Sequence, residues 1–130
     1  MKKLCGFTLI ELMVVILIVG VLAAAAVPLM RGRIDRSKWT EANAAAGSIR
    51  TAMKAYLMET GNTVTGSLGN ASVQQALGVQ SSDLTGSYFV AEDYNIDSVN
   101  ADGVAVVTVT ASQSNAPSGS KTLKLDGTFE

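Results

Sequence analysis

The sequence has no histidine, a single cysteine and few charged residues, and these absences exclude several classes of protein. Without histidine, the chain lacks the commonest general base and the commonest metal ligand. Because Cys5 is the only cysteine, no disulfide can form within the chain. A net charge of −1 provides no basic surface for nucleic acid. We therefore expect neither an enzyme nor a metal or cofactor protein, and we expect no nucleic-acid partner.

The first quarter of the chain contains a long apolar segment. Residues 7–30 are 24 residues that carry one charge, Glu11. As a helix, this segment would be about 36 Å long, enough to cross a hydrocarbon core of ~30 Å with some tilt. Lys2 and Lys3 precede it, and such a positive flank stays in the cytoplasm. The pattern predicts a membrane-spanning helix with the rest of the chain on the far side.

An ordinary secretory signal, cleaved among Ala23–Ala26, is the alternative interpretation. Two features argue against it. A charge such as Glu11 costs roughly 2.5–3.5 kcal/mol near the centre of a bilayer, less near one end, and a disposable signal gains nothing from it. The apolar segment is also longer than the ~7–15 residues of a signal core.

The run Gly6-Phe7-Thr8-Leu9-Ile10-Glu11 follows a short basic leader, and it resembles the class III signal of type IV pilins and pseudopilins. The resemblance implies that prepilin peptidase cleaves between Gly6 and Phe7 and methylates the new Phe7 amine. It also implies that Glu11 acts in subunit assembly and that Pro28 kinks the helix. The expected organisation is a leader at 1–6, a transmembrane and assembly helix at 7–30 and a pilin-like globular domain at 31–130.

Glu11 has two interpretations that the sequence leaves open. Thr8 and Glu11 have the spacing of a capping box, in which the two side chains satisfy free amides at a helix start. Alternatively, the Glu11 carboxylate pairs with a Phe7 amine, either its own or that of a neighbouring subunit. Pairing with a neighbour would set the axial register between subunits, which is the role that the resemblance implies.

Past Met30 the apolar run changes to an amphipathic pattern, so we expect one helix from 8 to about 60, ended by Gly61. Pro28 should kink or locally melt it. The stripe expected to face a core contains Ala42, Ala45, Ala46, Ile49, Ala52, Met53 and Tyr56. The opposite, polar face contains Arg36, Asn43, Arg50 and Lys54.

The C-terminal half carries strand signals. Residues 62–86 read as a loop with a short helix at 72–77 closed by Gly78, and residues 112–120 as a second, polar loop. Asp126-Gly127 predicts a hairpin turn between 121–125 and 128–130. The other expected strands are 87–91, 94–99 and 103–111, with a turn at 100–103. The predicted fold class is α+β, a long helix packed on a three- or four-stranded antiparallel sheet, which the resemblance also implies.

Two polar clusters are candidate sites. Asp93, Asn95 and Asp97 alternate as at the start of a calcium-binding loop. However, Ser98 stands where such a loop requires glycine, and Val104 stands where it requires an acid that binds calcium through both oxygens. The pattern therefore favours a solvated strand face. A basic cluster follows the apolar segment, and it is either a solvated membrane flank or a contact to neighbouring subunits. Its members are Arg31, Arg33, Arg36 and Lys38. Trp39 is expected in the core, and a membrane-edge or intersubunit contact is the alternative.

The resemblance implies a structural function, namely the major subunit of a type IV pilus. A type II secretion pseudopilin is the alternative, and a membrane-anchored binding protein that does not polymerise is a third hypothesis. The implied partners are further copies of the chain in a helical filament, prepilin peptidase, the inner-membrane assembly machinery and, before assembly, membrane lipid. The precursor is expected in the bacterial inner membrane with its N-terminus cytoplasmic. The final location is an extracellular pilus or a periplasmic pseudopilus.

Overall fold

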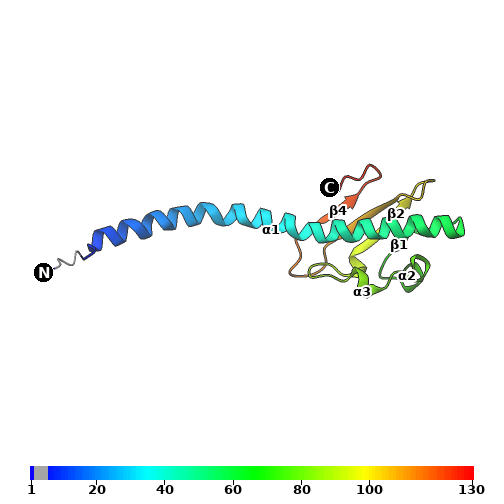
Figure 1. Ribbon diagram of the computed structural model, residues 1–130, viewed down its shortest axis with the longest axis horizontal. Helices are drawn as coiled ribbons and strands as arrows, with labels where there is room; N and C mark the ends of the chain where they lie inside the picture. Colours follow the sequence, from blue (N-terminus) through cyan, green and yellow to red (C-terminus); the bar gives the residue numbers. More distant parts are fainter. Residues whose placement is uncertain (2–5) are drawn as a thin grey trace. The chain divides into compact units, whose positions relative to one another are not determined.

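A computed structural model describes residue 1 and residues 6–130, so most of the expected leader lies outside the described residues. Its elements are helices α1 (Leu9–Thr60), α2 (Ala71–Leu77) and α3 (Ser81–Leu84), a 3₁₀ turn η1 (Ala91–Asp93) and strands β1–β4 (Figure 1). The strands are β1 (Gly66–Ser67), β2 (Tyr94–Val99), β3 (Ala105–Thr110) and β4 (Ser120–Leu123). The chain divides into two compact units, residues 1–34 and 35–130.

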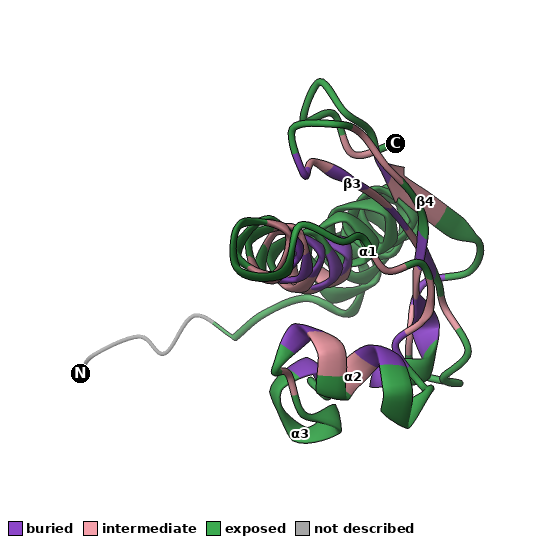
Figure 2. Ribbon diagram, turned by 90° about the vertical axis from the view of Figure 1, so that its right-hand side faces the viewer, coloured by how far each residue is buried: buried purple, intermediate pink, exposed green. Residues whose placement is uncertain are grey.

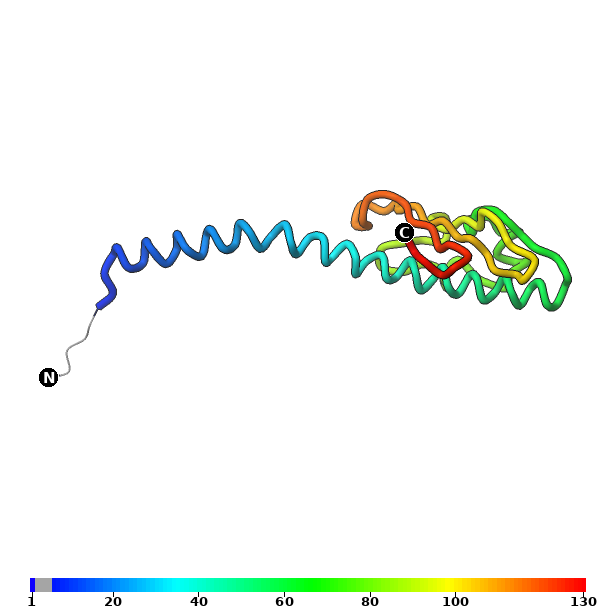
Figure 3. Tube along the Cα trace, turned by 90° about the horizontal axis from the view of Figure 1, so that it is seen from above, coloured from blue at the N-terminus to red at the C-terminus, as the bar shows by residue number. Residues whose placement is uncertain are grey.

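Helix α1 confirms the long helix predicted from the sequence. It begins at Leu9 and ends at Thr60, and Gly61 follows in a left-handed conformation with its amide bonded to the Leu57 carbonyl. Only glycine adopts that conformation without strain, which explains the stop. The helix is continuous through Pro28, so the proline does not melt it. Within the unit of residues 1–34, the described trace is this helix and the short segment before it (Figure 3).

The second unit is the predicted α+β fold. Strands β1 to β4 form one antiparallel sheet in sequence order, so each strand pairs with the next along the chain. The register pairs Ile96 with Val107 and Val107 with Leu123, which places these apolar residues on one face. Figure 2 shows the buried side of α1 turned toward that face. The bulge at Asp97 interrupts the β2–β3 ladder.

One core holds this unit together. The predicted stripe supplies Ala42, Ala46, Ile49 and Met53, which are completely buried. Burying apolar side chains contributes roughly 25 cal/mol per Å² removed from water, so this stripe is the main link between helix and sheet. The remaining core members are Trp39 of α1 and residues of the strands, the short helices and the segments that connect them. They are Trp39, Leu68, Val73, Leu77, Leu84, Phe89, Ala91, Tyr94, Ile96, Ala105, Val107, Val109 and Leu123.

The strand predicted at 87–91 is wrong. This segment has no strand pairing and ends in the η1 turn. Its amides at Ser87, Tyr88 and Phe89 bond to the carboxylate of Glu41, so they are not available to a neighbouring strand. The fourth strand is β1, which lies in the stretch predicted as loop. The short helix before Gly78 is confirmed as α2, and Gly78 adopts the left-handed conformation.

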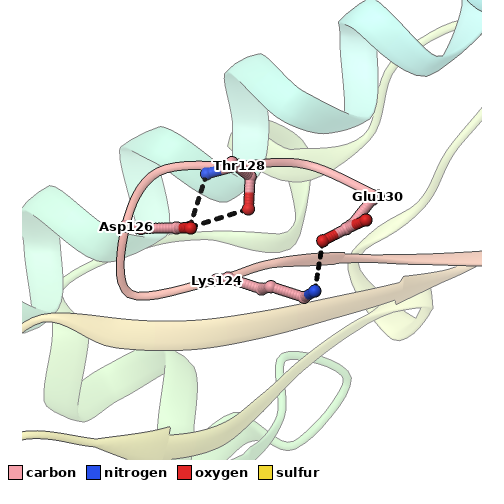
Figure 4. A network of polar contacts seen from close by, with 4 residues as sticks. All are labelled: Lys124, Asp126, Thr128 and Glu130. Carbon is pink, nitrogen blue, oxygen red and sulfur yellow. Dashed lines mark hydrogen bonds and ion pairs between the residues drawn. The ribbon is translucent and has the colours of Figure 1, made fainter.

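The C-terminal segment folds back as the predicted hairpin. Leu123 and Phe129 form a β-bridge, and Thr122 and Glu130 exchange both backbone hydrogen bonds. Figure 4 shows the polar contacts that close the turn. The Asp126 carboxylate accepts from the Thr128 amide at 2.9 Å and hydroxyl at 2.7 Å, and Lys124 pairs with Glu130. Residues 128–130 therefore cover the outer edge of β4, which would otherwise be open to another strand.

We predict that this hairpin weakens in acid. The bonds from Thr128, its hydroxyl first and then its amide, lower the pKa of Asp126. A carboxyl with a lowered pKa stabilises the fold above its unfolded pKa, and that contribution is lost as pH falls through the lower, folded pKa. In an NMR titration, the Thr128 amide should therefore shift with a midpoint below about 3.9. The Asp126→Asn variant should abolish the pH-dependent shift of the Thr128 amide. A midpoint at or above about 3.9 would contradict the lowered pKa of Asp126.

Candidate assembly site

The N-terminal part of α1 presents apolar side chains all round. No residue of its most apolar window is buried within the chain, and it is the one helix in the described chain long and apolar enough to cross a membrane. Contact between so large an apolar surface and water is unfavourable, so lipid or other helices must cover it. Its exposed large side chains are Leu9, Ile10, Leu12, Met13, Val14, Val15, Ile16, Leu17, Ile18, Val19, Val21, Leu22, Val27, Leu29, Met30 and Ile34.

The start of α1 contains the predicted capping box. The Glu11 amide donates to the Thr8 hydroxyl at 3.3 Å, and the Thr8 amide donates to the Glu11 carboxylate at 3.4 Å. These bonds are long compared with the 2.7–3.2 Å typical of N–H···O bonds. No ion pair joins Glu11 to any residue that the structure describes. The Glu11 carboxylate is therefore exposed, held weakly and available to a cation from outside the described chain.

The expected cleavage position lies just before the helix. Gly6 and Phe7 are outside regular structure and exposed, and nothing lies within 4 Å of the position that a Gly6 side chain would take. Exposed backbone outside regular structure is what a protease needs. Cys5, Lys2 and Lys3 belong to the expected leader and lie outside the described residues. Cleavage, methylation and the kink at Pro28 remain predictions.

Glu41 has a structural role that the sequence does not predict. It is half-buried on α1, and its carboxylate accepts hydrogen bonds from three consecutive amides, at 3.1 Å from Ser87, 2.9 Å from Tyr88 and 3.1 Å from Phe89. Gly86 leaves room for it, because a side-chain carbon there would lie 2.3 Å from Glu41 Oε1. Glu41 thus ties the segment before β2 to the helix, and no local sequence signal marks it.

The sequence places Arg50 on the polar face opposite the core stripe, and that placement is wrong because its guanidinium bonds to the sheet region. Its Nε donates to the Ala105 carbonyl at 2.9 Å, and its Nη2 donates to the Leu123 and Lys124 carbonyls at 3.1 and 2.6 Å. Burial lowers the pKa of Arg50, and the nearby Asp126 opposes this. Arginine remains charged at neutral pH despite such a shift. The guanidinium therefore joins α1 to the start of β3 and the end of β4.

Lys38 provides a third polar link from α1. Its ammonium donates to the Asn115 carbonyl at 2.7 Å and lies 5.1 Å from the centroid of the Tyr88 ring. Asn115 in turn donates to the Ser87 carbonyl at 2.9 Å. Within the predicted basic cluster, Lys38 thus holds the polar loop at 112–120 in place. Together, Lys38, Glu41 and Arg50 connect the helix to separate parts of the sheet region without a disulfide.

The acidic residues considered for calcium do not form a site. Asp93 is buried in η1, where its carboxylate accepts from the Val90 amide at 2.9 Å. The two Asp97 oxygens accept from the Asn95 amide group at 2.6 Å and the Thr108 hydroxyl at 2.5 Å. No group of three metal-ligating acids, cysteines or histidines occurs among residues 6–130. The three side chains thus serve a turn and the outer face of the sheet.

Comparison with known families agrees with this geometry. The family model described as a prokaryotic N-terminal methylation motif matches residues 1–27, the part that contains Gly6, Phe7 and Glu11. The model described as pilin (bacterial filament) matches residues 36–130, almost the whole globular unit. The chain belongs to the pilin family. Membership of this structural family identifies the exposed helix before the globular unit as part of a filament-forming protein.

Individual pilins are similar to the chain over different lengths. A type IV major fimbrial protein FimA of Dichelobacter nodosus is 32% identical over 119 residues, which cover 85% of this chain and 72% of that protein. The type IV major alpha-pilin of Moraxella bovis is 40% identical over 78 residues, 60% of this chain and 48% of that protein. A fimbrial protein of Pseudomonas aeruginosa is 36% identical over 84 residues, covering 65% and 54%. The chain thus spans about half the length of the latter two pilins.

Proposed function

We propose that the chain is the major structural subunit of a type IV pilus and that it polymerises through residues 7–30. The observation that carries the proposal is the apolar helix of the first unit, whose side chains nothing in the described chain covers. A second copy of the same helix is a partner of the right length and chemistry. Several relatives are named as type IV major pilins or fimbrial proteins, which favours a pilus over a secretion pseudopilus.

Transfer from lipid to filament has a physical basis in the residues of the helix. In lipid there is no hydrophobic gain from bringing apolar helices together, so close packing and polar contacts provide the attraction. Gly20 and the run Ala23–Ala26 permit close approach of backbones. Glu11 provides the polar contact, and its partner in the filament is the amine of a neighbouring Phe7. This pair sets the register between subunits, whereas a lone anchor would gain nothing from a buried carboxylate.

Processing and topology complete the proposal. Prepilin peptidase cleaves between Gly6 and Phe7 and methylates Phe7, which creates the cationic amine that Glu11 requires. Lys2 and Lys3 keep the leader in the cytoplasm, so the globular unit is on the outer side of the inner membrane. The assembly machinery then transfers the mature subunit into an extracellular filament. The chain has a structural role, and catalysis forms no part of it.

The test is mass spectrometry of the native protein recovered from filaments sheared from the cell surface. We expect the mature chain to be the main protein and to begin with methylated Phe7. A Gly6→Val variant should stay uncleaved and membrane-bound, since a branched side chain blocks access to the backbone. An N-terminus among Ala23–Ala26 would contradict the proposal. Retention of the mature chain in short periplasmic filaments would support the pseudopilin alternative.

A further inference from the structure

A groove beside Trp39 has no role in the fold or in the proposed helix assembly. Its volume is about 220 Å³, below the roughly 300–1,000 Å³ of pockets for drug-sized ligands. It belongs entirely to the globular unit and is formed by the helix, β4 and the C-terminal segment. Two aromatic rings, two cations and two neutral polar groups surround it. They are Arg36, Trp39, Thr40, Asn43, Lys121 and Phe129.

The aromatic rings hold one of the cations in place. The Trp39 and Phe129 rings meet edge to face with centroids 6.0 Å apart, and Lys121 Nζ lies 5.9 Å and 5.7 Å from the two centroids. Attraction between the ammonium and the ring faces restricts Lys121 before any ligand arrives. Lys121 is half-buried, so its charge is screened less than a fully exposed one. A pre-positioned cation of this kind favours an anionic ligand.

The positive charge of the groove is not neutralised by the acids around it. No described carboxylate lies within ion-pair distance of Lys121 or Arg36. Glu130 follows Phe129 but pairs with Lys124. Glu41 keeps its charge, but neither it nor the amides that bind its carboxylate line the groove. Exposed Asp35 is the remaining acid next to a lining residue in sequence. The lining itself therefore carries two cations and no acid.

The chain also restricts where the groove can lie. Arg36 comes six residues after Met30, the last residue of the expected membrane segment. Six residues span at most about 20 Å in any conformation and about 9 Å as helix. The headgroup layer adds roughly 5–8 Å outside the hydrocarbon on each side. Because α1 continues as helix past Met30, the shorter distance applies to Arg36, which brings this residue within reach of outer-leaflet headgroups in a membrane-bound subunit.

We propose that this groove binds the phosphate headgroup of an anionic phospholipid, a proposal that rests on the membrane-bound precursor of the proposed function. The planar Arg36 guanidinium suits two phosphate oxygens, and Lys121 supplies a second charge. The Asn43 amide can donate to the headgroup, and the aromatic wall covers its carbon atoms. Each subunit in the membrane has such a headgroup within reach, whereas an acidic side chain of a second copy requires a specific encounter.

Native mass spectrometry of the full-length protein in micelles tests the proposal. The micelles contain equal amounts of phosphatidylglycerol and phosphatidylcholine with the same acyl chains. We expect one retained phosphatidylglycerol per chain. In R36Q/K121Q, the preference of the protein for phosphatidylglycerol over phosphatidylcholine should fall roughly 25-fold, about five-fold for each cation removed. The matched control is R31Q/R33Q, which removes the same charge nearer the membrane but outside the groove. It should retain the bound lipid, and circular dichroism should show both variants folded.

Trp39 provides a second readout because it is the only tryptophan in the chain. Its emission should change on titration with phosphatidylglycerol, saturate at one lipid per chain and stay constant with phosphatidylcholine. Equal loss of lipid in both double variants would overturn the proposal in favour of a diffuse basic flank. The proposal would also be overturned if Trp39 emission changed with the number of chains per micelle and not with the lipid. That result would indicate that a second copy of the chain occupies the groove.

Flotation with phosphatidylcholine vesicles separates this proposal from the proposed function. A chain that floats but shows no preference for phosphatidylglycerol refutes the headgroup site and leaves the membrane-bound precursor intact. A chain that does not float refutes the membrane-bound state and, with it, the headgroup site. A chain that floats and retains phosphatidylglycerol through Arg36 and Lys121 supports both.

Discussion

Replacing Glu41 by alanine should lower the free energy of unfolding of the globular unit by about 3–5 kcal/mol. The three amides that donate to its carboxylate would lose a charged acceptor, and the bonds from Tyr88 and Phe89 are partly buried. A hydrogen bond to a charged group contributes about 1.5–3 kcal/mol, and the contributions overlap because one carboxylate accepts all three. Urea denaturation of residues 31–130, which contain the whole described core, measures the loss.

Two variants on the same helix make the Glu41 experiment specific. Glu59→Ala removes an exposed carboxylate that makes no hydrogen bond or ion pair to any described residue, so its effect should stay within about 0.5 kcal/mol. Glu41→Gln keeps one oxygen acceptor but turns an amide group toward the backbone donors. Its free energy of unfolding should therefore lie between those of Glu41→Ala and the unaltered protein. Equal stability of Glu41→Ala and Glu59→Ala would show that the three bonds contribute nothing.

Gly86 offers an independent check of the same contact. An alanine side chain there would clash with the Glu41 carboxylate at 2.3 Å, so the carboxylate must leave its three donors. In Glu41→Ala the clash no longer exists. The two substitutions should therefore be strongly non-additive, with Gly86→Ala costing much less when Glu41 is absent.

The parts of the fold that the sequence predicted are those with local signals. The stripe that includes Ala42, Ile49 and Met53 follows the period of a helix, and all three residues are buried. Asp126-Gly127 predicts a hairpin because few other pairs adopt that turn, and the hairpin is present. Each of these signals lies within a few residues of the element that it specifies.

The parts that could not be predicted depend on contacts between distant residues. Glu41 and the amide of Phe89 are 48 positions apart, and Arg50 and the Lys124 carbonyl are 74 apart. The segment 87–91 has the composition of a strand, but its amides are taken by a helix side chain. The sequence around a polar residue beside an apolar stripe looks the same whether its side chain faces solvent or bonds to a backbone group. Only the three-dimensional arrangement distinguishes the two cases.

The candidate assembly site was also predictable only in part. The spacing of Thr8 and Glu11 gave the capping box, and that box is present. The second interpretation of Glu11 concerns a partner in another chain, so a single chain does not test it. Because the capping bonds are long and exposed, they do not compete strongly with an ion pair. The cap in the free subunit is therefore compatible with the ion pair proposed for the filament.

Glu11→Ala should abolish filaments while leaving the subunit processed and membrane-bound. After cleavage, the filament interior would contain a cationic Phe7 amine beside the Glu11 carboxylate, in surroundings that screen charge much less than water. Removing one member of such a pair costs about 3–5 kcal/mol because the other charge is left buried and unpaired. In the free subunit, lipid headgroups and water relieve that charge. In a filament the loss repeats at every subunit contact, so polymerisation should fail.

The measurement compares cleaved protein in membranes with protein in the sheared surface fraction, together with electron microscopy of filaments. Glu11→Gln keeps the shape and the helix cap but not the charge, so it should give few filaments. Glu59→Ala removes a charge at the other end of α1, where no pair is expected, and should assemble normally. Wild-type filament yield from Glu11→Ala would limit the residue to its capping role. Loss of the protein from membranes would indicate failed insertion, and the assembly role would then have no support.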